Sequence, residues 1–112
     1  MWRLFRPEDK AFEPYGKGTA EIKRVMRQRV EEGRFEGFGL LRIPPRGEFP
    51  RHNHPERDEV YFVTSGSGTL LVGGEEVPLS EGCVVYVSGE EPHGLSNRSD
   101  EPLVVFYATA FA

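Results

Sequence analysis

The stretch EVYFVTSGSGTLLVGGEEVPL (residues 59–79) holds three short runs of β-type residues joined by brief glycine-containing turns. The runs are rich in Val, Leu, Phe, Tyr and Thr, which suit a pleated strand. Gly73 and Gly74 separate the second run from the third, and glycine tolerates the positive φ that a tight hairpin turn requires. Strands joined by turns this short predict an antiparallel sandwich or barrel and not an alternating α/β fold.

Similar runs continue on both sides of this stretch. They cover residues 38–43, 83–87, 93–97 and 103–110. A chain of 112 residues has room for one compact domain. We therefore expect an all-β fold, with one barrel domain over residues 19–112 and an N-terminal arm over residues 1–18.

The N-terminal part of the chain is less regular. TAEIKRVMRQRV (19–30) fits either a helix or a strand, because its apolar residues satisfy both periods. Since GRFEG (33–37) and another β-type run follow, we favour a hairpin. In the arm, the apolar side chains of Trp2, Leu4 and Phe5 predict that the arm is not free in solvent.

The run EVYFVT shows how its strand is expected to pack. Side chains alternate along a strand, so Glu59, Tyr61 and Val63 point to one face. The opposite face carries Val60 and Phe62 and is also largely apolar. A strand of a lone barrel normally shows water one face. We therefore expect the arm or a second subunit to cover the outer face, and we predict a homodimer.

Composition narrows the class of protein. Cys83 is the only cysteine, so an intrachain disulfide is impossible and a reducing compartment is favoured. The stretch MWRLFRPEDK does not resemble a signal peptide, and no window has the ~18 apolar residues of a membrane span. A net charge of −4 argues against nucleic acid as the main partner. We expect a cytoplasmic protein that binds neither nucleic acid nor membrane.

The three histidines of the chain carry the chemical signal. His52 and His54 form an H-x-H pair, and on an extended strand this spacing sends both imidazoles to one face. Glu59 follows at the start of the next run, and His93 begins another run after Pro92. Three imidazoles and one carboxylate suit Fe, Mn, Co, Ni or Zn as a divalent ion.

The make-up of this set argues for a reactive centre. It contains no thiolate, unlike most closed structural zinc sites. One carboxylate leaves a divalent ion with net positive charge, and four protein ligands leave about two octahedral positions for water, substrate or O₂.

Two segments resemble the conserved motifs of the cupin superfamily. GEFPRHNHPERDEVYFVTSG (47–66) resembles the first motif, with H-x-H, a gap of four residues, a glutamate and a later glycine. GCVVYVSGEEPHGLSN (82–97) resembles the second, with a leading glycine, a histidine and an asparagine. The resemblance implies a jelly-roll barrel, also called a double-stranded β-helix. It also implies that the metal ligands are His52, His54, Glu59 and His93. In the same way it implies that Gly66 and Gly82 are turn glycines and that Asn97 is a structural residue near the site.

The resemblance leaves the reaction open, because this fold carries many chemistries. We favour a non-haem iron dioxygenase or related oxidoreductase acting on a small molecule. A metal-dependent isomerase or lyase of a sugar or small acid is the first alternative, and a non-catalytic binding module is the second. Tyr61 shares the face of Glu59 and is our candidate for a catalytic proton carrier. An inward Arg42 or Arg51 would favour an anionic substrate, and Cys83 is expected to be a small buried side chain.

Overall fold

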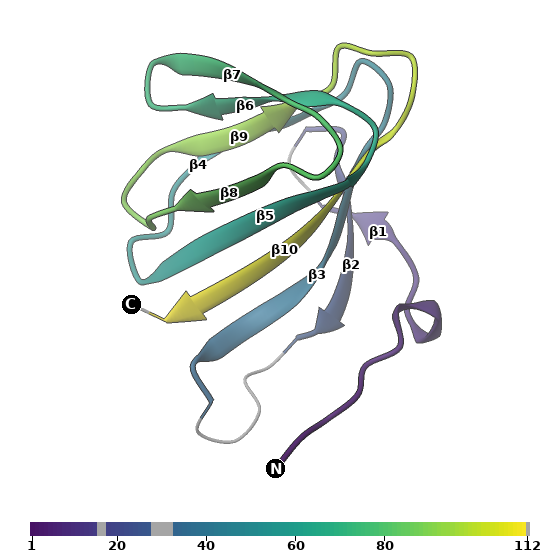
Figure 1. Cartoon of the computed structure of the whole chain (residues 1–112), viewed down its shortest axis with the longest axis vertical. Helices are drawn as coiled ribbons and strands as arrows, with labels where there is room; N and C mark the ends of the chain where they lie inside the picture. The colour runs from purple at the N-terminus through teal and green to yellow at the C-terminus, as the bar shows by residue number, and fades with distance from the viewer. Residues whose placement is uncertain (16–17, 28–32, 112) are drawn as a thin grey trace.

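The computed structural model describes residues 1–15, 18–27 and 33–111, which form two antiparallel β-sheets (Figure 1). In spatial order, the larger sheet contains β1 (Glu13–Pro14), β2 (Glu21–Met26), β3 (Phe35–Ile43), β10 (Leu103–Phe111), β5 (Arg57–Ser65) and β8 (Val84–Val87). The smaller sheet contains β4 (Glu48–His52), β9 (His93–Ser96), β6 (Gly68–Val72) and β7 (Glu75–Leu79). One 3₁₀ turn, η1 (Pro7–Asp9), lies in the arm. No helix in these ranges is long and apolar enough to cross a membrane.

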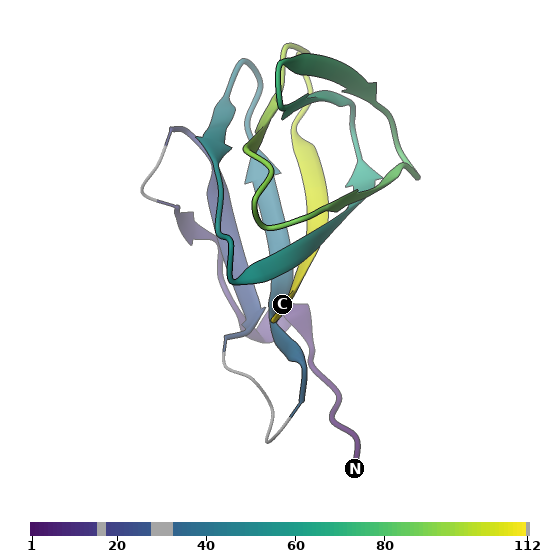
Figure 2. The same ribbon diagram turned by 90° about the vertical axis from the view of Figure 1, so that its left-hand side faces the viewer.

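The two sheets fold towards each other and enclose the core between their inner faces (Figure 2). Strand β10 shows the alternation that builds this core, since its odd-numbered residues from Leu103 to Thr109 are buried and the residues between them are partly exposed. In β5, Tyr61 and Val63 are fully buried and Glu59 is 6% exposed. The predicted all-β antiparallel barrel and the predicted inward face of β5 are therefore confirmed.

Local sequence predicted most strand positions. The runs at 68–72 and 75–79 are β6 and β7, and Gly73 in the turn between them has a φ of 55°. Strand β2 pairs antiparallel with β3, as expected of a hairpin; its predicted turn lies partly outside the described residues. Strand β4 was not among the predicted runs, because Pro50 and the charged residues beside it are uncommon in strands. As an edge strand of its sheet, β4 accommodates a proline.

The arm behaves differently from the prediction. Phe5 packs edge-on against Phe38 of β3, with ring centroids 5.2 Å apart. Trp2 and Leu4, however, are 84% and 65% exposed, so the single chain does not cover this part of the arm as expected. The arm passes beside β2 and β3 and does not reach the outer face of β5, where Phe62 remains 41% exposed (Figure 1).

Candidate metal centre

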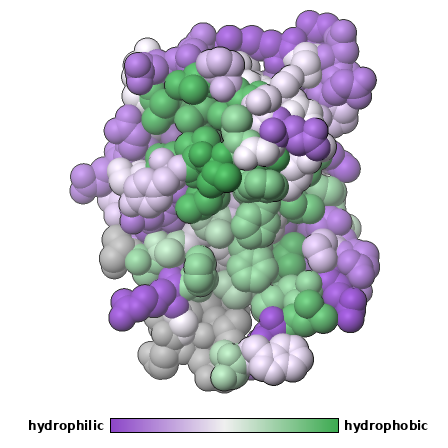
Figure 3. Space-filling view, viewed as in Figure 1, coloured by the Kyte–Doolittle hydropathy of each residue, from purple (hydrophilic) through white to green (hydrophobic). Residues whose placement is uncertain are grey.

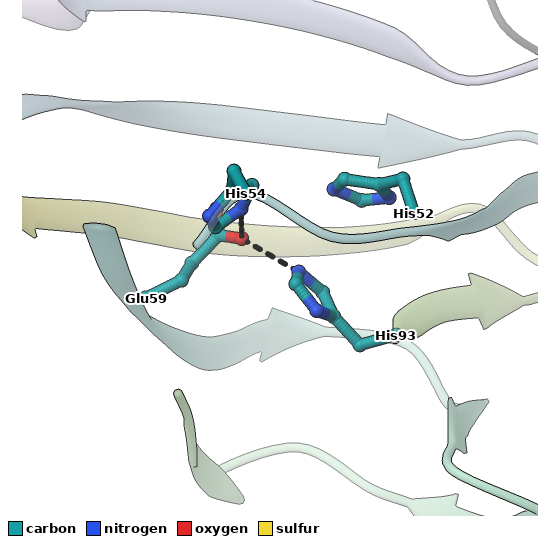
Figure 4. A group of neighbouring side chains, drawn as sticks. All are labelled: His52, His54, Glu59 and His93. Atoms are coloured by element: carbon teal, nitrogen blue, oxygen red, sulfur yellow. Dashed lines mark hydrogen bonds and ion pairs between the residues drawn. The ribbon is translucent and has the colours of Figure 1, made fainter. Parts of the chain in front are cut away.

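The four predicted ligands meet at one point inside the barrel (Figure 4). One potential ligand atom from each of His52, His54, Glu59 and His93 lies within 4.8 Å of the others. His52 is the last residue of β4 and His93 is the first of β9, and the two are paired across the sheet. His54 lies in the loop after β4, so the expectation that the whole H-x-H pair is on a strand is wrong. His54 nevertheless points inward, where its Nδ1 donates to the backbone oxygen of Arg57.

Backbone carbonyls fix the orientation of all three imidazoles. The Nδ1 atoms of His52, His54 and His93 donate to the backbone oxygens of Pro50, Arg57 and Glu91 at 3.1, 3.0 and 2.7 Å. Because a carbonyl oxygen only accepts, each Nδ1 carries the hydrogen and the lone pair of a neutral ring is on Nε2. Histidines that bind metals commonly donate their second ring nitrogen in this way.

The Nε2 atoms of two of these rings face the carboxylate of Glu59. Those of His54 and His93 lie 3.2 and 3.1 Å from Glu59 Oε1 (Figure 4). Burial favours the neutral form of Glu59, but hydrogen bonds from the two histidines prevail and lower its pKa to about 2. An ionised oxygen facing neutral Nε2 lone pairs would be repelled, and a cation between them removes this repulsion. Without a metal this cation is a proton, and the hydrogen bond to Glu59 accordingly raises the pKa of His54.

The same donor set fits a divalent metal ion. Neutral imidazole nitrogens and a carboxylate oxygen are ligands for Fe, Mn, Co, Ni or Zn. Glu59 and His93 are 6% and 0% exposed, so the cluster is shielded from bulk water on the side of the core. An ionised carboxylate at this depth needs a positive partner, which a metal ion would provide.

Tyr61 lies behind the cluster. Its side chain is fully buried, and its hydroxyl donates to Glu59 Oε1 at 3.0 Å. Burial, and then the negative charge of Glu59, raise the pKa of Tyr61 well above its ordinary value, so the phenol stays protonated. Tyr61 does not line the pocket described next. Its catalytic role remains a prediction.

A pocket of about 220 Å³ opens beside the cluster. Three of the four ligands, His52, His54 and Glu59, contribute to its wall. Its remaining polar lining comes from Tyr15, Arg24, Arg27, Glu36, Arg57, Tyr107 and Thr109. This volume is below the usual range for drug-sized ligands and suits a small molecule.

None of those seven polar lining residues was a sequence candidate. Arg57 carried a readable signal, since it is two residues before Glu59 on one strand and therefore shares its face. Arg24 lies in the segment whose helix or strand state was ambiguous. Tyr15 and Tyr107 come from opposite ends of the chain, and only the tertiary fold brings them together.

Most secondary sequence candidates lie away from the pocket. Arg42 donates to Glu21 at 2.9 Å, and Arg51 is exposed; neither lines the pocket. Cys83 is only partly buried. Asn97 is buried, but it follows the last residue of β9, whereas His93 is the first, so Asn97 is not beside the metal ligands.

The model of the cupin domain family matches residues 39–109. The chain belongs to the cupin family. The resemblance seen in the two sequence motifs is therefore confirmed, and the barrel is the double-stranded β-helix of the cupins.

Known relatives of this cupin differ in what they are described to do. It is 32% identical over 82 residues to the tetracenomycin polyketide synthase protein TcmJ of Streptomyces glaucescens, covering 71% of this chain and 55% of TcmJ. An uncharacterized protein of Methanocaldococcus jannaschii is 20% identical over 104 residues, which cover 92% of this chain and 83% of that protein.

Solved structures share the fold at low sequence identity. A predicted oxalate decarboxylase from Thermotoga maritima superimposes with a TM-score of 0.87 at 20% identity, covering 98% of this cupin and 100% of that chain. The polyketide cyclase RemF from Streptomyces resistomycificus gives a TM-score of 0.81 at 20% identity, covering 99% and 80%. At these identities the likeness shows the fold alone.

Proposed function

We propose that this cupin is an enzyme that acts on a small molecule with one divalent transition-metal ion held by His52, His54, Glu59 and His93. The observation that carries the proposal is the arrangement of the imidazoles: their Nδ1 atoms are committed to carbonyls, and two Nε2 atoms converge on the ionised Glu59. A bound ion would supply Lewis acidity at the wall of the pocket. Fe, Mn, Ni, Co and Zn all remain compatible with this donor set.

The residues around the cluster have separable roles in this proposal. Tyr61 positions the Glu59 carboxylate through its hydrogen bond, which fixes the direction of the ligand oxygen. Tyr15 and Tyr107 line the pocket, and their hydroxyls make no hydrogen bond to any described residue. Burial raises the pKa of Tyr107 to about 12, so its hydroxyl remains a neutral donor towards a bound molecule.

For the reaction we propose first a dioxygenase-type oxidation, in which the pocket would hold the small substrate beside the metal ligands. A metal-dependent isomerase or lyase is the second candidate. The two pocket tyrosines favour it, because a positioned hydroxyl can exchange protons with substrate without any redox change. A sugar phosphate isomerase of the cupin superfamily from Silicibacter pomeroyi has the same fold, with a TM-score of 0.69.

Metal analysis tests the centre, and oxygen uptake separates the reactions. Protein purified without added metal should contain close to one transition-metal ion per chain by elemental analysis. His54→Ala and Glu59→Gln should each lose most of it, whereas Glu90→Gln, which removes an exposed carboxylate, should retain it. Equal metal content in all four proteins would refute the ligand set.

A panel of small phenols, diketones and thiols then tests the chemistry of the loaded protein. Oxygen consumption with one of them supports the dioxygenase. Turnover of a substrate without oxygen consumption supports an isomerase or lyase. Binding without turnover supports the non-catalytic module.

We also propose that the protein is a homodimer through the outer face of the larger sheet. An apolar band crosses this face over β8, β5, β10 and β3 (Figure 3). Phe62, Val84 and Tyr86 there are 41%, 64% and 66% exposed. Trp2 of the arm is also exposed. Each chain therefore carries an uncovered apolar face and an apolar arm, and the arm of one copy could cover the face of another.

A further inference from the structure

The walls of the pocket carry more positive than negative side chains. Arg24, Arg27 and Arg57 line it, against the carboxylates of Glu36 and the ligand Glu59. This excess arises in a chain whose overall charge is −4. A divalent ion at the cluster would add further positive charge. Glu13 pairs with Arg24, but with the ion bound the pocket would still carry net positive charge and would attract anions.

Arg57 has a buried hydrogen-bond donor that its neighbours do not use. Its Nε is buried and has no hydrogen-bond partner among the described residues. Its nearest carboxylate oxygens, on Glu36 and Glu56, lie 3.5 and 3.8 Å from Nη1, and neither contact is a hydrogen bond. By contrast, Arg24 donates to Glu13 at 2.6 Å and Arg42 to Glu21 at 2.9 Å. The partly buried guanidinium of Arg57 therefore has N–H donors that no acceptor of the described residues satisfies.

Arg57 lies on the same side of the sheet as the metal cluster. Arg57 and Glu59 are two residues apart on β5 and so face the same side of the sheet. The backbone oxygen of Arg57 accepts the Nδ1 hydrogen of His54, which joins the two residues through one turn of chain. One small molecule can therefore contact the guanidinium and the ligand cluster together.

From these observations we infer that Arg57 binds an anionic oxygen group, a carboxylate or a phosphate, of the small molecule that this cupin takes. This inference rests on the proposed function, because the remainder of the molecule would reach the metal cluster. A guanidinium binds either group through two parallel hydrogen bonds. The free hydroxyls of Tyr15 and Tyr107 provide further donors in the same pocket.

Calorimetric titration of Mn(II)-loaded protein tests the inference with matched probes. Lactate is compared with neutral lactamide, and glycerol 3-phosphate with neutral glycerol. We expect at least one acid to bind ten-fold or more tightly than its neutral counterpart. The stronger acid identifies whether carboxylate or phosphate is preferred. If neither acid is favoured over its neutral counterpart, the inference is overturned.

Variants assign the preference to Arg57. Arg57→Gln should weaken binding of the preferred acid by about ten- to one hundred-fold and leave the neutral probe unchanged, as expected for a charged hydrogen-bonded pair. Arg57→Lys, which keeps the charge but not the fork, should fall between. Arg51→Gln is the control, because Arg51 adjoins the ligand His52 but is exposed and outside the pocket lining.

Manganese content, measured first, separates the two levels of failure. Wild-type protein that takes up neither manganese nor Fe, Co, Ni or Zn would overturn the proposed function and this inference with it. Loaded wild-type and Arg57→Gln proteins with equal affinity for the acid would overturn only the inference. If Arg57→Gln does not fold, the comparison of acid with neutral probe on wild-type protein still decides whether the pocket selects anions.

Discussion

Replacing Asn97 should destabilise the barrel strongly, because this one side chain joins three segments. Asn97 is 1% exposed, and its Nδ2 donates to the carbonyls of Ile43, Pro44 and Glu101 at 3.0, 3.2 and 2.7 Å. Its Oδ1 accepts from the backbone nitrogen and the hydroxyl of Ser99 at 3.0 and 2.7 Å. The side chain therefore fastens the end of β3 to the loop that leads into β10.

The expected size of the effect follows from these contacts. A buried carbonyl left without a donor costs about 1–3 kcal/mol. Asn97→Ala removes the donor from three carbonyls, of which one bond is buried and two are partly buried. We expect the free energy of unfolding to fall by about 3 kcal/mol. At about 2.1 cal/mol/K of unfolding entropy per residue, this lowers the Tm of a chain of 112 residues by roughly 13 °C.

Urea unfolding of the metal-free protein measures this change, with an unchanged m-value as the check that both proteins unfold in the same way. Asn97→Asp isolates the donor, because the two side chains have nearly the same shape and only the amide donates. It should cost at least as much as Asn97→Ala at neutral pH, since a carboxylate would face carbonyl oxygens. Ser99→Ala removes the hydroxyl bond to Asn97 Oδ1 and two exposed bonds to the backbone of Glu101 but leaves every donor of Asn97 in place, and it should cost about 1 kcal/mol. An Asn97→Asp protein within 1 kcal/mol of wild type would refute the reasoning.

Four further substitutions test other parts of the molecule. Tyr61→Phe removes the hydroxyl behind the ligand carboxylate, and we expect about ten-fold weaker metal affinity with little change in circular dichroism; unchanged affinity would contradict a positioning role. Gly66→Ala should cost at least 3 kcal/mol, because its φ is 83° and a Cβ would overlap the backbone oxygen of Pro102. Gly82→Ala has a φ of 92° but open space, so about 1 kcal/mol is expected from the same denaturation assay, and equal costs would refute the role of the overlap. Phe62→Glu should shift the protein to a monomer in sedimentation analysis without lowering its metal content, and an unchanged mass would exclude this face as the interface.

Local patterns predicted the strands better than they predicted the pocket. Alternation and short turns indicate β6 and β7 because both signals act over a few residues. The prediction for Trp2 and Leu4 failed for a related reason: apolar character indicates that a side chain tends to be covered, but does not say by what. For β4, the proline argued against a strand, and only its place at the edge of the sheet makes the proline acceptable.

By itself, the sequence determined the all-β class and the identity of four ligand candidates, because periodicity and ligand chemistry are properties of residue types at short spacing. The tertiary structure decided three things that spacing does not encode. It turned His54 inward from a loop, moved Tyr61 behind Glu59 and away from the pocket, and brought Tyr15 and Tyr107 from opposite ends of the chain to one wall. The physical reason is that a pocket is formed by side chains from several strands, and their convergence depends on how the two sheets close on each other.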